Sequence, residues 1–311
     1  MAGKERSIAM SADGTEQLSW TESLCCPTDV LRPGNTNCPG CGMSTALRWL
    51  ERALSGTPII LCIPAGCAVV TAGIHPISAY GVPTVATPFA SSAAVAAGIR
   101  IVQNLNGDPG QTLCWAGDGA TYDIGVATVS AAAERDEDII YVCYDNEIYG
   151  NTGGQRSSST PIHAVTTTTP RGKSQHKKNI MAIVAAHRIP YAATLSLAHP
   201  DDFLRKVRYA ASIRGFRFLL IHSPCPTGWK SDPAESIELD RLAVASGLFP
   251  LYEVFEGRRY RINVRPSGVS PEEYFRRQGR FWKVAADWKG RDDMKQEWEY
   301  LENMARLCPA E

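Results

Sequence analysis

Short apolar runs alternate with amphipathic segments along the middle of the chain. Nearly continuous apolar runs, typical of strands covered on both faces of a parallel sheet, occur at residues 59–63, 112–116, 138–144, 191–194 and 216–222. Helices are expected between these strands, at 42–54, 91–102, 123–134, 179–187 and 201–213. Residues 42–54 show the three-to-four-residue apolar spacing of a helix, and 91–102 and 123–134 are rich in small residues. This alternation predicts a doubly wound α/β fold with a mostly parallel sheet.

The two ends of the chain differ from this middle part. Residues 1–34 are polar and contain the breakers Pro27, Pro33 and Gly34, which indicates an N-terminal arm. Residues 35–230 hold the alternating pattern and form the expected α/β domain. Residues 231–311 are more charged and aromatic, and we expect a helical C-terminal extension there. Within the domain, residues 151–178 form a long loop rich in Ser, Thr, Gly and Lys, and loops of that length are usually functional.

Composition narrows the functional classes. The 311 residues include 32 Lys and Arg against 32 Asp and Glu, so no net charge attracts nucleic acid or an anionic membrane. No stretch reaches the ~20 apolar residues that a membrane helix needs, and no apolar run follows the N-terminus as in a signal peptide. We therefore expect a cytoplasmic protein, whose ten cysteines are ligands or buried thiols rather than disulfides.

Two polar segments follow neighbouring predicted strands. Gly117-Asp118-Gly119 comes directly after one strand, and Asn146 follows the next strand, 28 residues beyond Asp118. The glycines allow backbone N–H groups to approach phosphate oxygens, and Asp118, Asn146 and the Ile148 carbonyl offer the oxygen ligands that Mg²⁺ prefers. The alternative is structural, with Asp118 as a helix cap and Asn146 as a turn residue. Because both segments lie at carboxyl ends of strands, we favour a magnesium-held diphosphate.

Four cysteines lie in three loops. Cys38 and Cys41 form a CxxC pair, Cys67 follows the first strand, and Cys225 follows the last strand of the domain. Four such thiolates can enclose a [4Fe–4S] cluster. A Cys₄ zinc site and simple buried thiols are the alternatives. Three further cysteines lie inside apolar strand runs and are expected to pack in the core: Cys62, Cys114 and Cys143.

The longer motifs resemble a known family. AGDGATYDIG (116–125), YDNEIYGNTGGQRSSSTP (144–161) and CPGCG (38–42) resemble the β subunit of 2-oxoacid:ferredoxin oxidoreductases, the pyruvate type in particular. The similarity runs from about residue 35 to 230, with a further trace at Gln278-Gly279-Arg280-Phe281.

The resemblance implies a site and its cofactors. Thiamine diphosphate is expected, held through Mg²⁺ by Asp118, Asn146 and the Ile148 carbonyl, in the fold of thiamine-diphosphate-binding domains of the pyrophosphate (PP) type. Asn151 would lie beside the thiazolium or the diphosphate and is the catalytic candidate. One [4Fe–4S] cluster would be held by the four loop cysteines, which are Cys38, Cys41, Cys67 and Cys225.

The resemblance also implies a reaction and partners. We expect oxidative decarboxylation of a small, pyruvate-like 2-oxoacid, with coenzyme A as acyl acceptor and electrons passed to soluble ferredoxin. An α subunit would supply the pyrimidine-binding domain and the catalytic Glu, and a ferredoxin-like subunit would carry further clusters. A branched or long substrate is less expected, because the 144–161 loop is pyruvate-like.

Two departures from the family leave the substrate open. Met43 and Phe89-Ala90-Ser91 stand where pyruvate-type relatives carry more polar residues. An oxalate oxidoreductase subunit, which needs no coenzyme A, is therefore an alternative. Two further alternatives are a non-oxidative thiamine diphosphate decarboxylase or carboligase half-chain, which would not need the four cysteines, and a non-catalytic scaffold subunit.

Overall fold

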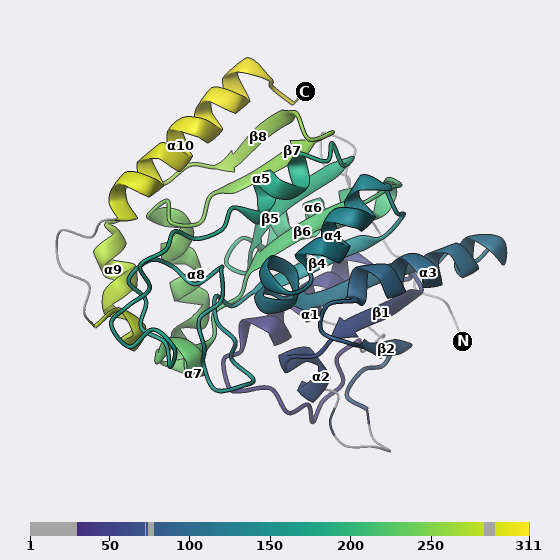
Figure 1. Ribbon diagram of the computed structural model, residues 1–311, viewed down its shortest axis with the longest axis horizontal. Coiled ribbons are helices and arrows are strands. Elements are labelled where there is room, and N and C mark those ends of the chain that lie inside the picture. The colour runs from purple at the N-terminus through teal and green to yellow at the C-terminus, as the bar shows by residue number, and fades with distance from the viewer. Residues whose placement is uncertain (1–29, 72, 74–77, 283–289, 311) are drawn as a thin grey trace, which may run out of the picture.

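An eight-stranded sheet organises the chain in the computed structural model, which describes residues 30–71, 73, 78–282 and 290–310 (Figure 1). In sheet order the strands are β2 (Thr84–Thr87), β1 (Ile59–Pro64), β3 (Gln111–Gly117), β4 (Ile140–Asp145), β6 (Arg217–His222), β5 (Tyr191–Ser196), β7 (Leu251–Phe255) and β8 (Arg259–Val264). All neighbours from β2 to β5 pair in parallel, whereas β7 and β8 are antiparallel. The predicted mostly parallel α/β fold is confirmed.

Helices cover both faces of the sheet, which is why its central strands are almost wholly apolar. On one face, α1 (Gly42–Ala53) and α6 (Pro200–Ser212) pack against each other over alternate residues of β1, β3, β4 and β5. On the other face lie α3 (Ser92–Leu105), α4 (Val126–Glu134) and α5 (Ile180–Ala185). Cys62, Cys114 and Cys143 point into this second layer and are fully buried, as expected for core thiols.

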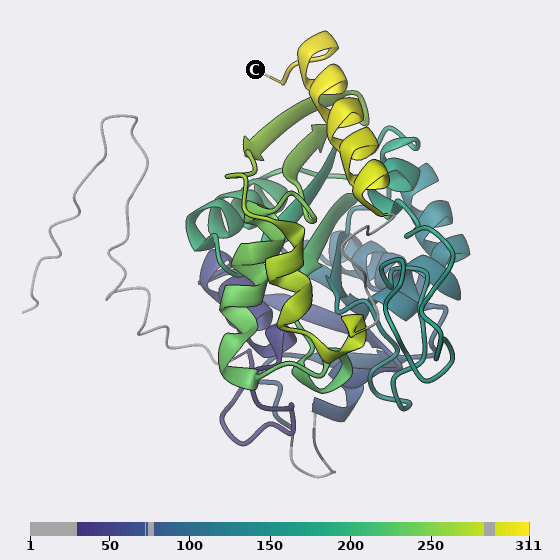
Figure 2. The ribbon, with the colours of Figure 1, turned by 90° about the vertical axis from the view of Figure 1, so that its left-hand side faces the viewer.

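The C-terminal region differs from its expectation. The sequence predicts helices beyond residue 230, and α8 (Ser236–Ala245), α9 (Pro271–Arg276) and α10 (Gly290–Leu307) are present. However, β7 and β8 add two strands to the sheet, and α10 packs along β8 (Figures 1 and 2). The sequence does not predict these strands because they contain charged residues that are typical of a surface. In the fold, Glu253 on β7 is buried and accepts a hydrogen bond from Tyr191 on β5 at 2.7 Å.

Several shorter elements were not predicted. They are α2 (Cys67–Thr71), the edge strand β2 (Thr84–Thr87), a π-helical turn η1 (Gly119–Asp123), α7 (Pro226–Trp229), and two 3₁₀ turns, η2 (Pro233–Glu235) and η3 (Gly279–Phe281). Most of the expected N-terminal arm lies outside the described residues. None of the helices in the described ranges combines the length and the apolar character that a bilayer crossing requires.

The strand order fixes where a ligand can bind. The connection from β1 leads to β2 on one side, while β3 lies on the other side, so the winding of the sheet reverses between β1 and β3. Open α/β sheets bind ligands at the carboxyl ends of their strands near such a reversal. Gly117 ends β3 opposite Tyr144, and Asp145 ends β4 opposite His222, so the exits of β3, β4 and β6 are level with one another.

A charge cluster stabilises the opposite, amino-terminal edge of the sheet. Asp138 pairs with Arg100 at 2.8 Å, with Arg214 at 2.8 Å and with Arg217, whose side chain has no exposed surface. Burial of Asp138 opposes its ionisation, but the three arginines outweigh burial and lower the pKa of this carboxyl to about 2. Asp138 therefore joins the end of α3 to the start of β6.

Asp138→Asn is expected to lower the free energy of unfolding by about 3 kcal/mol at neutral pH, because buried Arg217 loses its counter-charge. The folded-state pKa of about 2 lies below the ~3.9 of an unfolded Asp. The carboxylate's contribution is therefore fully present above about pH 4 and is lost as pH falls through 2. Urea unfolding at pH 7, 4 and 3 should show the difference from the wild type narrowing with acid.

The matched control is Glu302→Gln, which removes the exposed pair with Arg265. It should change stability by less than about 0.5 kcal/mol at every pH. An Asp138→Asn chain as stable as this control would contradict the assignment.

Candidate functional site

A cavity of about 180 Å³ lies at the carboxyl ends of β1, β3 and β4. Its lining contains seven of the residues selected from the sequence, which are Gly117, Asp118, Gly119, Asn146, Ile148, Asn151 and Cys67. Residues from three separate segments therefore meet in one place, as the strand order requires. Phe89 and Tyr149 complete part of the wall as an edge-to-face aromatic pair, with ring centroids 6.2 Å apart.

Asp118 is a buried carboxylate at the cavity wall, with only 2% of its surface exposed. It accepts hydrogen bonds from the Ser157 hydroxyl at 2.5 Å and from the backbone N–H of Gly119. Burial, followed by the nearby charge of Asp145, raises the pKa of Asp118 well above its usual range. A cation with oxygen preference would remove this penalty, so the donor set fits Mg²⁺.

Asp145 is not a second ligand of this kind, because its oxygens are already engaged. Tyr122 donates to Oδ2 at 2.8 Å, Lys177 pairs with Oδ2 at 3.0 Å, and Ser159 donates to Oδ1. The two carboxylates at the ends of β3 and β4 therefore have different roles, one structural and one facing the cavity.

The segment after β4 is a tight turn closed by hydrogen bonds, one of which runs from the Gly150 N–H to the Ile148 carbonyl at 2.9 Å. The side-chain oxygen of Asn146 accepts a hydrogen bond from the Ile148 N–H at 3.3 Å, which closes an Asx turn. Glu147, between them, has a φ of 61°, a left-handed conformation that is uncommon for a residue with a side chain. Such strain persists only where surrounding contacts enforce it, and it concentrates at functional sites.

Gly119 begins the π-helical turn after Asp118, and π-helical turns often mark functional sites. A Cβ at this position would collide with the ring of Tyr149. The Tyr149 hydroxyl in turn donates to Asp123 at 2.5 Å, which anchors the ring over the glycine. Glycine is therefore required here by close packing against Tyr149.

The four predicted cluster cysteines gather beside this cavity. Cys67 lies near enough to Cys41 and Cys38 for their charges to add to burial in raising the pKa of its thiol. The pKa of Cys225 is raised in the same way, by burial and by Cys41, Cys67 and Cys38. The chain brings the CxxC loop to the exit of β6 through a hydrogen bond from the Gly42 N–H to the Pro224 carbonyl at 2.9 Å.

Burial disfavours the thiolate form of three of these cysteines, whereas backbone N–H groups favour it. Burial raises the pKa of the Cys67 thiol to about 11 and that of Cys225 to about 12, and it also raises the pKa of Cys41. Backbone N–H groups point at the sulfurs: Asn151 at Cys67, Gly228 at Cys225, and Met43 and Ser44 at Cys41. Such N–H···S contacts are the usual surroundings of iron–sulfur ligands, and a metal would hold these thiols as thiolates.

Across the described ranges, no three His, Cys, Asp or Glu side chains are grouped as ligands of a single metal ion.

The cavity and the cysteine group share a wall at Gly150. A Cβ built on Gly150 would lie 3.7 Å from the Cys67 sulfur, 3.8 Å from the Cys225 sulfur and 3.9 Å from the Asn146 amide nitrogen. Asn151, the next residue, is exposed and lines the cavity, while its backbone N–H reaches Cys67. One short segment thus separates the two predicted sites.

A buried group of ion pairs, which the sequence did not predict, lies beside the turn at residues 146–148. Glu147 pairs with Lys177 at 2.9 Å and with Arg280 at 2.7 Å. Burial opposes the ionisation of Glu147, but Lys177 and Arg280 outweigh it and lower its pKa to about 2. The available signal was the family-like trace that contains Arg280.

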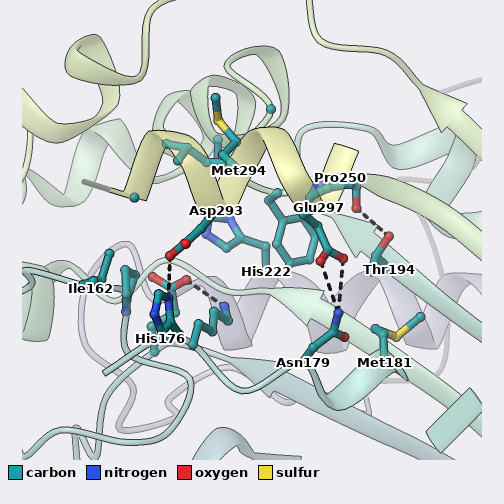
Figure 3. A pocket seen from close by; sticks show the side chains of 18 of the residues that line it. Ile162, His176, Asn179, Met181, Thr194, His222, Pro250, Asp293, Met294 and Glu297 are labelled. Atoms are coloured by element: carbon teal, nitrogen blue, oxygen red, sulfur yellow. Dashed lines mark hydrogen bonds and ion pairs between the residues drawn. The ribbon is translucent and has the colours of Figure 1, made fainter. Parts of the chain in front are cut away.

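A larger cavity of about 410 Å³ lies on the other side of this group (Figure 3). It is mostly apolar, and Glu147 and Lys177 form part of its wall. Contacts between His176 and Asp293 at 2.6 Å and between Asn179 and Glu297 at 3.2 Å join the long loop region to α10 beside it. It contains neither Asp118 nor a cysteine, so it is distinct from the predicted cofactor site.

Comparisons with known proteins identify relatives of this chain. The family described as thiamine pyrophosphate enzyme, C-terminal TPP binding domain, matches residues 64–222. Ketoisovalerate oxidoreductase subunit VorB of Pyrococcus horikoshii is 42% identical over 88% of this chain and 93% of its own length. Pyruvate synthase subunit PorB of Methanothermobacter thermautotrophicus is 42% identical over 85% of this chain and 93% of its own length.

A solved structure supports the fold. A 2-oxoglutarate:ferredoxin oxidoreductase from Magnetococcus marinus superimposes with a TM-score of 0.58 at 22% identity, over 89% of this chain and 91% of that chain. With the relatives above, the assignment is plain: the chain belongs to the β subunits of the 2-oxoacid:ferredoxin oxidoreductase family and contains a thiamine-diphosphate-binding domain.

Proposed function

We propose that this chain works in a hetero-oligomer that oxidatively decarboxylates a small aliphatic 2-oxoacid and passes the electrons to ferredoxin. Each turnover would convert the 2-oxoacid anion and the coenzyme A thiol into an acyl thioester, CO₂, one proton and two electrons. The observation that carries the proposal is the wall at Gly150, where the Cys67 and Cys225 sulfurs and the Asn146 side chain come together. A cofactor that releases electrons and a centre that accepts them would then be neighbours.

In this proposal the smaller cavity holds the diphosphate end of the cofactor. Asp118, Asn146 and the Ile148 carbonyl would bind Mg²⁺, and the backbone at Gly117 and Gly119 would approach the phosphate oxygens. Bound thiamine diphosphate supplies the electron sink that the loss of CO₂ requires. Asn151 lies in the cavity lining, so its side chain would contact the cofactor.

Cys38, Cys41, Cys67 and Cys225 would hold one [4Fe–4S] cluster. Their mutual proximity and the N–H groups directed at three of the sulfurs support this ligand set. The cluster would take up electrons singly, as iron–sulfur centres do.

Partner chains complete the proposal. A cavity of about 180 Å³ is smaller than the ~300–1,000 Å³ of typical cofactor pockets. Another chain should therefore close the site, and we assign to it the pyrimidine-binding domain and the catalytic Glu of an α subunit. A ferredoxin-like subunit would lead electrons outward to soluble ferredoxin. Residues 35–230 would form the cofactor-binding unit, and residues 231–311 would support it.

Two substitutions should distinguish the thiamine diphosphate site from the cluster site in the assembled enzyme, purified without oxygen. Asp118→Ala should lose Mg²⁺-dependent thiamine diphosphate binding and nearly all activity, yet keep about four irons per copy of this chain. Cys225→Ser should lose most of the iron and keep thiamine diphosphate. Iron, acid-labile sulfide and thiamine content measure both outcomes.

Cys308→Ser is the control, since this cysteine lies beyond α10 and its backbone carbonyl pairs with Tyr260. It should change none of the contents. Wild-type enzyme with zinc or no metal in place of iron would refute the redox proposal in favour of a non-oxidative thiamine enzyme. Full activity in Asp118→Ala would indicate a scaffold subunit instead.

A substrate panel tests the reaction. Pyruvate, 2-oxoisovalerate, 2-oxoglutarate and oxalate would be supplied with and without coenzyme A, and viologen reduction would be followed. Highest activity is expected with pyruvate, and only in the presence of coenzyme A. Since relatives named for pyruvate and for ketoisovalerate are equally similar, 2-oxoisovalerate is the second expected substrate. Oxalate oxidation without coenzyme A would overturn the proposed substrate and acceptor.

A further inference from the structure

One tryptophan contacts both loops that the proposed function assigns to cofactors. Trp229 is fully buried at the end of α7, the short helix that begins directly after Cys225. Its backbone N–H donates to the Cys225 carbonyl at 2.8 Å, and its indole N–H donates to the Asn146 carbonyl at 2.8 Å. A single residue therefore joins the proposed cluster ligand to the proposed magnesium turn.

The backbone of α7 also packs against both loops. A Cβ on Gly228 would lie 2.9 Å from the Ile148 side chain and 3.1 Å from the Cys225 sulfur. No side chain fits between the helix and these groups, so a shift of α7 would move them together.

Arg280 lies over the ring of this tryptophan. Its guanidinium carbon lies 3.9 Å from the centre of the Trp229 ring, close enough for a cation–π contact in a buried setting. The same guanidinium pairs with Glu147 at 2.7 Å. Glu147 is the left-handed residue between Asn146 and Ile148, so Arg280 contacts the turn and the tryptophan at once.

We propose that Trp229 is a positioning residue that holds the thiamine diphosphate site and the cluster site at a fixed separation. This inference rests on the proposed function. Its physical basis is the hydrogen bond from the Trp229 indole N–H to the Asn146 carbonyl. This bond links α7, the helix that follows Cys225, to the turn that carries the proposed Mg²⁺ ligands. The rate of electron transfer falls steeply with distance, so loosening this link should slow cluster reduction without changing substrate binding.

The test compares Trp229→Phe with Trp298→Phe in the assembled enzyme. Phenylalanine keeps a ring for Arg280 but removes the indole donor. Trp298 on α10 makes an equivalent bond, from its indole N–H to the Gly247 carbonyl at 2.8 Å, away from both sites. Iron content, the apparent Kd for Mg²⁺ with thiamine diphosphate, and the rate of cluster reduction after mixing with pyruvate would be measured for each.

Trp229→Phe should keep four irons per copy of this chain. It should weaken Mg²⁺ binding by about 5- to 10-fold, as expected for the loss of one buried hydrogen bond. At saturating cofactor it should slow cluster reduction and leave the KM for pyruvate unchanged. Trp298→Phe should leave all three values at the wild-type level. The inference is overturned if the two variants behave alike, or if only Mg²⁺ affinity changes.

Arg280→Lys serves if Trp229→Phe does not assemble with its irons. Lysine keeps a positive charge beside Glu147 but lacks the planar group over the indole, and the same two changes are expected. Unchanged values in that variant would overturn the inference. Wild-type enzyme without iron would instead overturn the proposed function.

Discussion

Parallel pairing of β1, β3, β4 and β6 is the constraint on which the rest of the structure depends. Parallel neighbours end at the same edge of a sheet, so the segments that follow them meet even when they are far apart in the chain. Cys67, Asp118, Asn146 and Cys225 each follow one of these four strands. No local signal could bring them together; the order of the strands does.

Burial of charge is the second constraint. Glu147 and Asp145 flank Asn146 and lie in the interior, where an unpaired carboxylate would be strongly destabilising. Lys177 from the long loop compensates both of them, and Arg280 from beyond β8 compensates Glu147. Ion pairs of this kind are weak evidence for stability, and here they surround the residue whose backbone adopts the left-handed conformation.

The sequence predicted the parts whose information is local. Continuous apolar runs identified five of the parallel strands, and the GDG and CxxC motifs identified the loops that carry polar chemistry. It failed for β7 and β8, because Glu253 resembles a surface residue until Tyr191 and Arg205 surround it. It also failed for Trp229 and Arg280, since an indole or a guanidinium gains its role only from the partner that the fold places beside it.

The two ends of the sheet differ in the residues that they carry. The Asp138 arginine cluster closes the amino-terminal edge, while the loops that follow β1, β3, β4 and β6 and carry candidate chemistry leave the carboxyl-terminal edge. Sites so far apart, with no shared partners, contribute to stability independently. Substitutions in these loops should therefore leave the contribution of the Asp138 cluster unchanged, which gives such a family a physical route to vary its loops on one lasting framework.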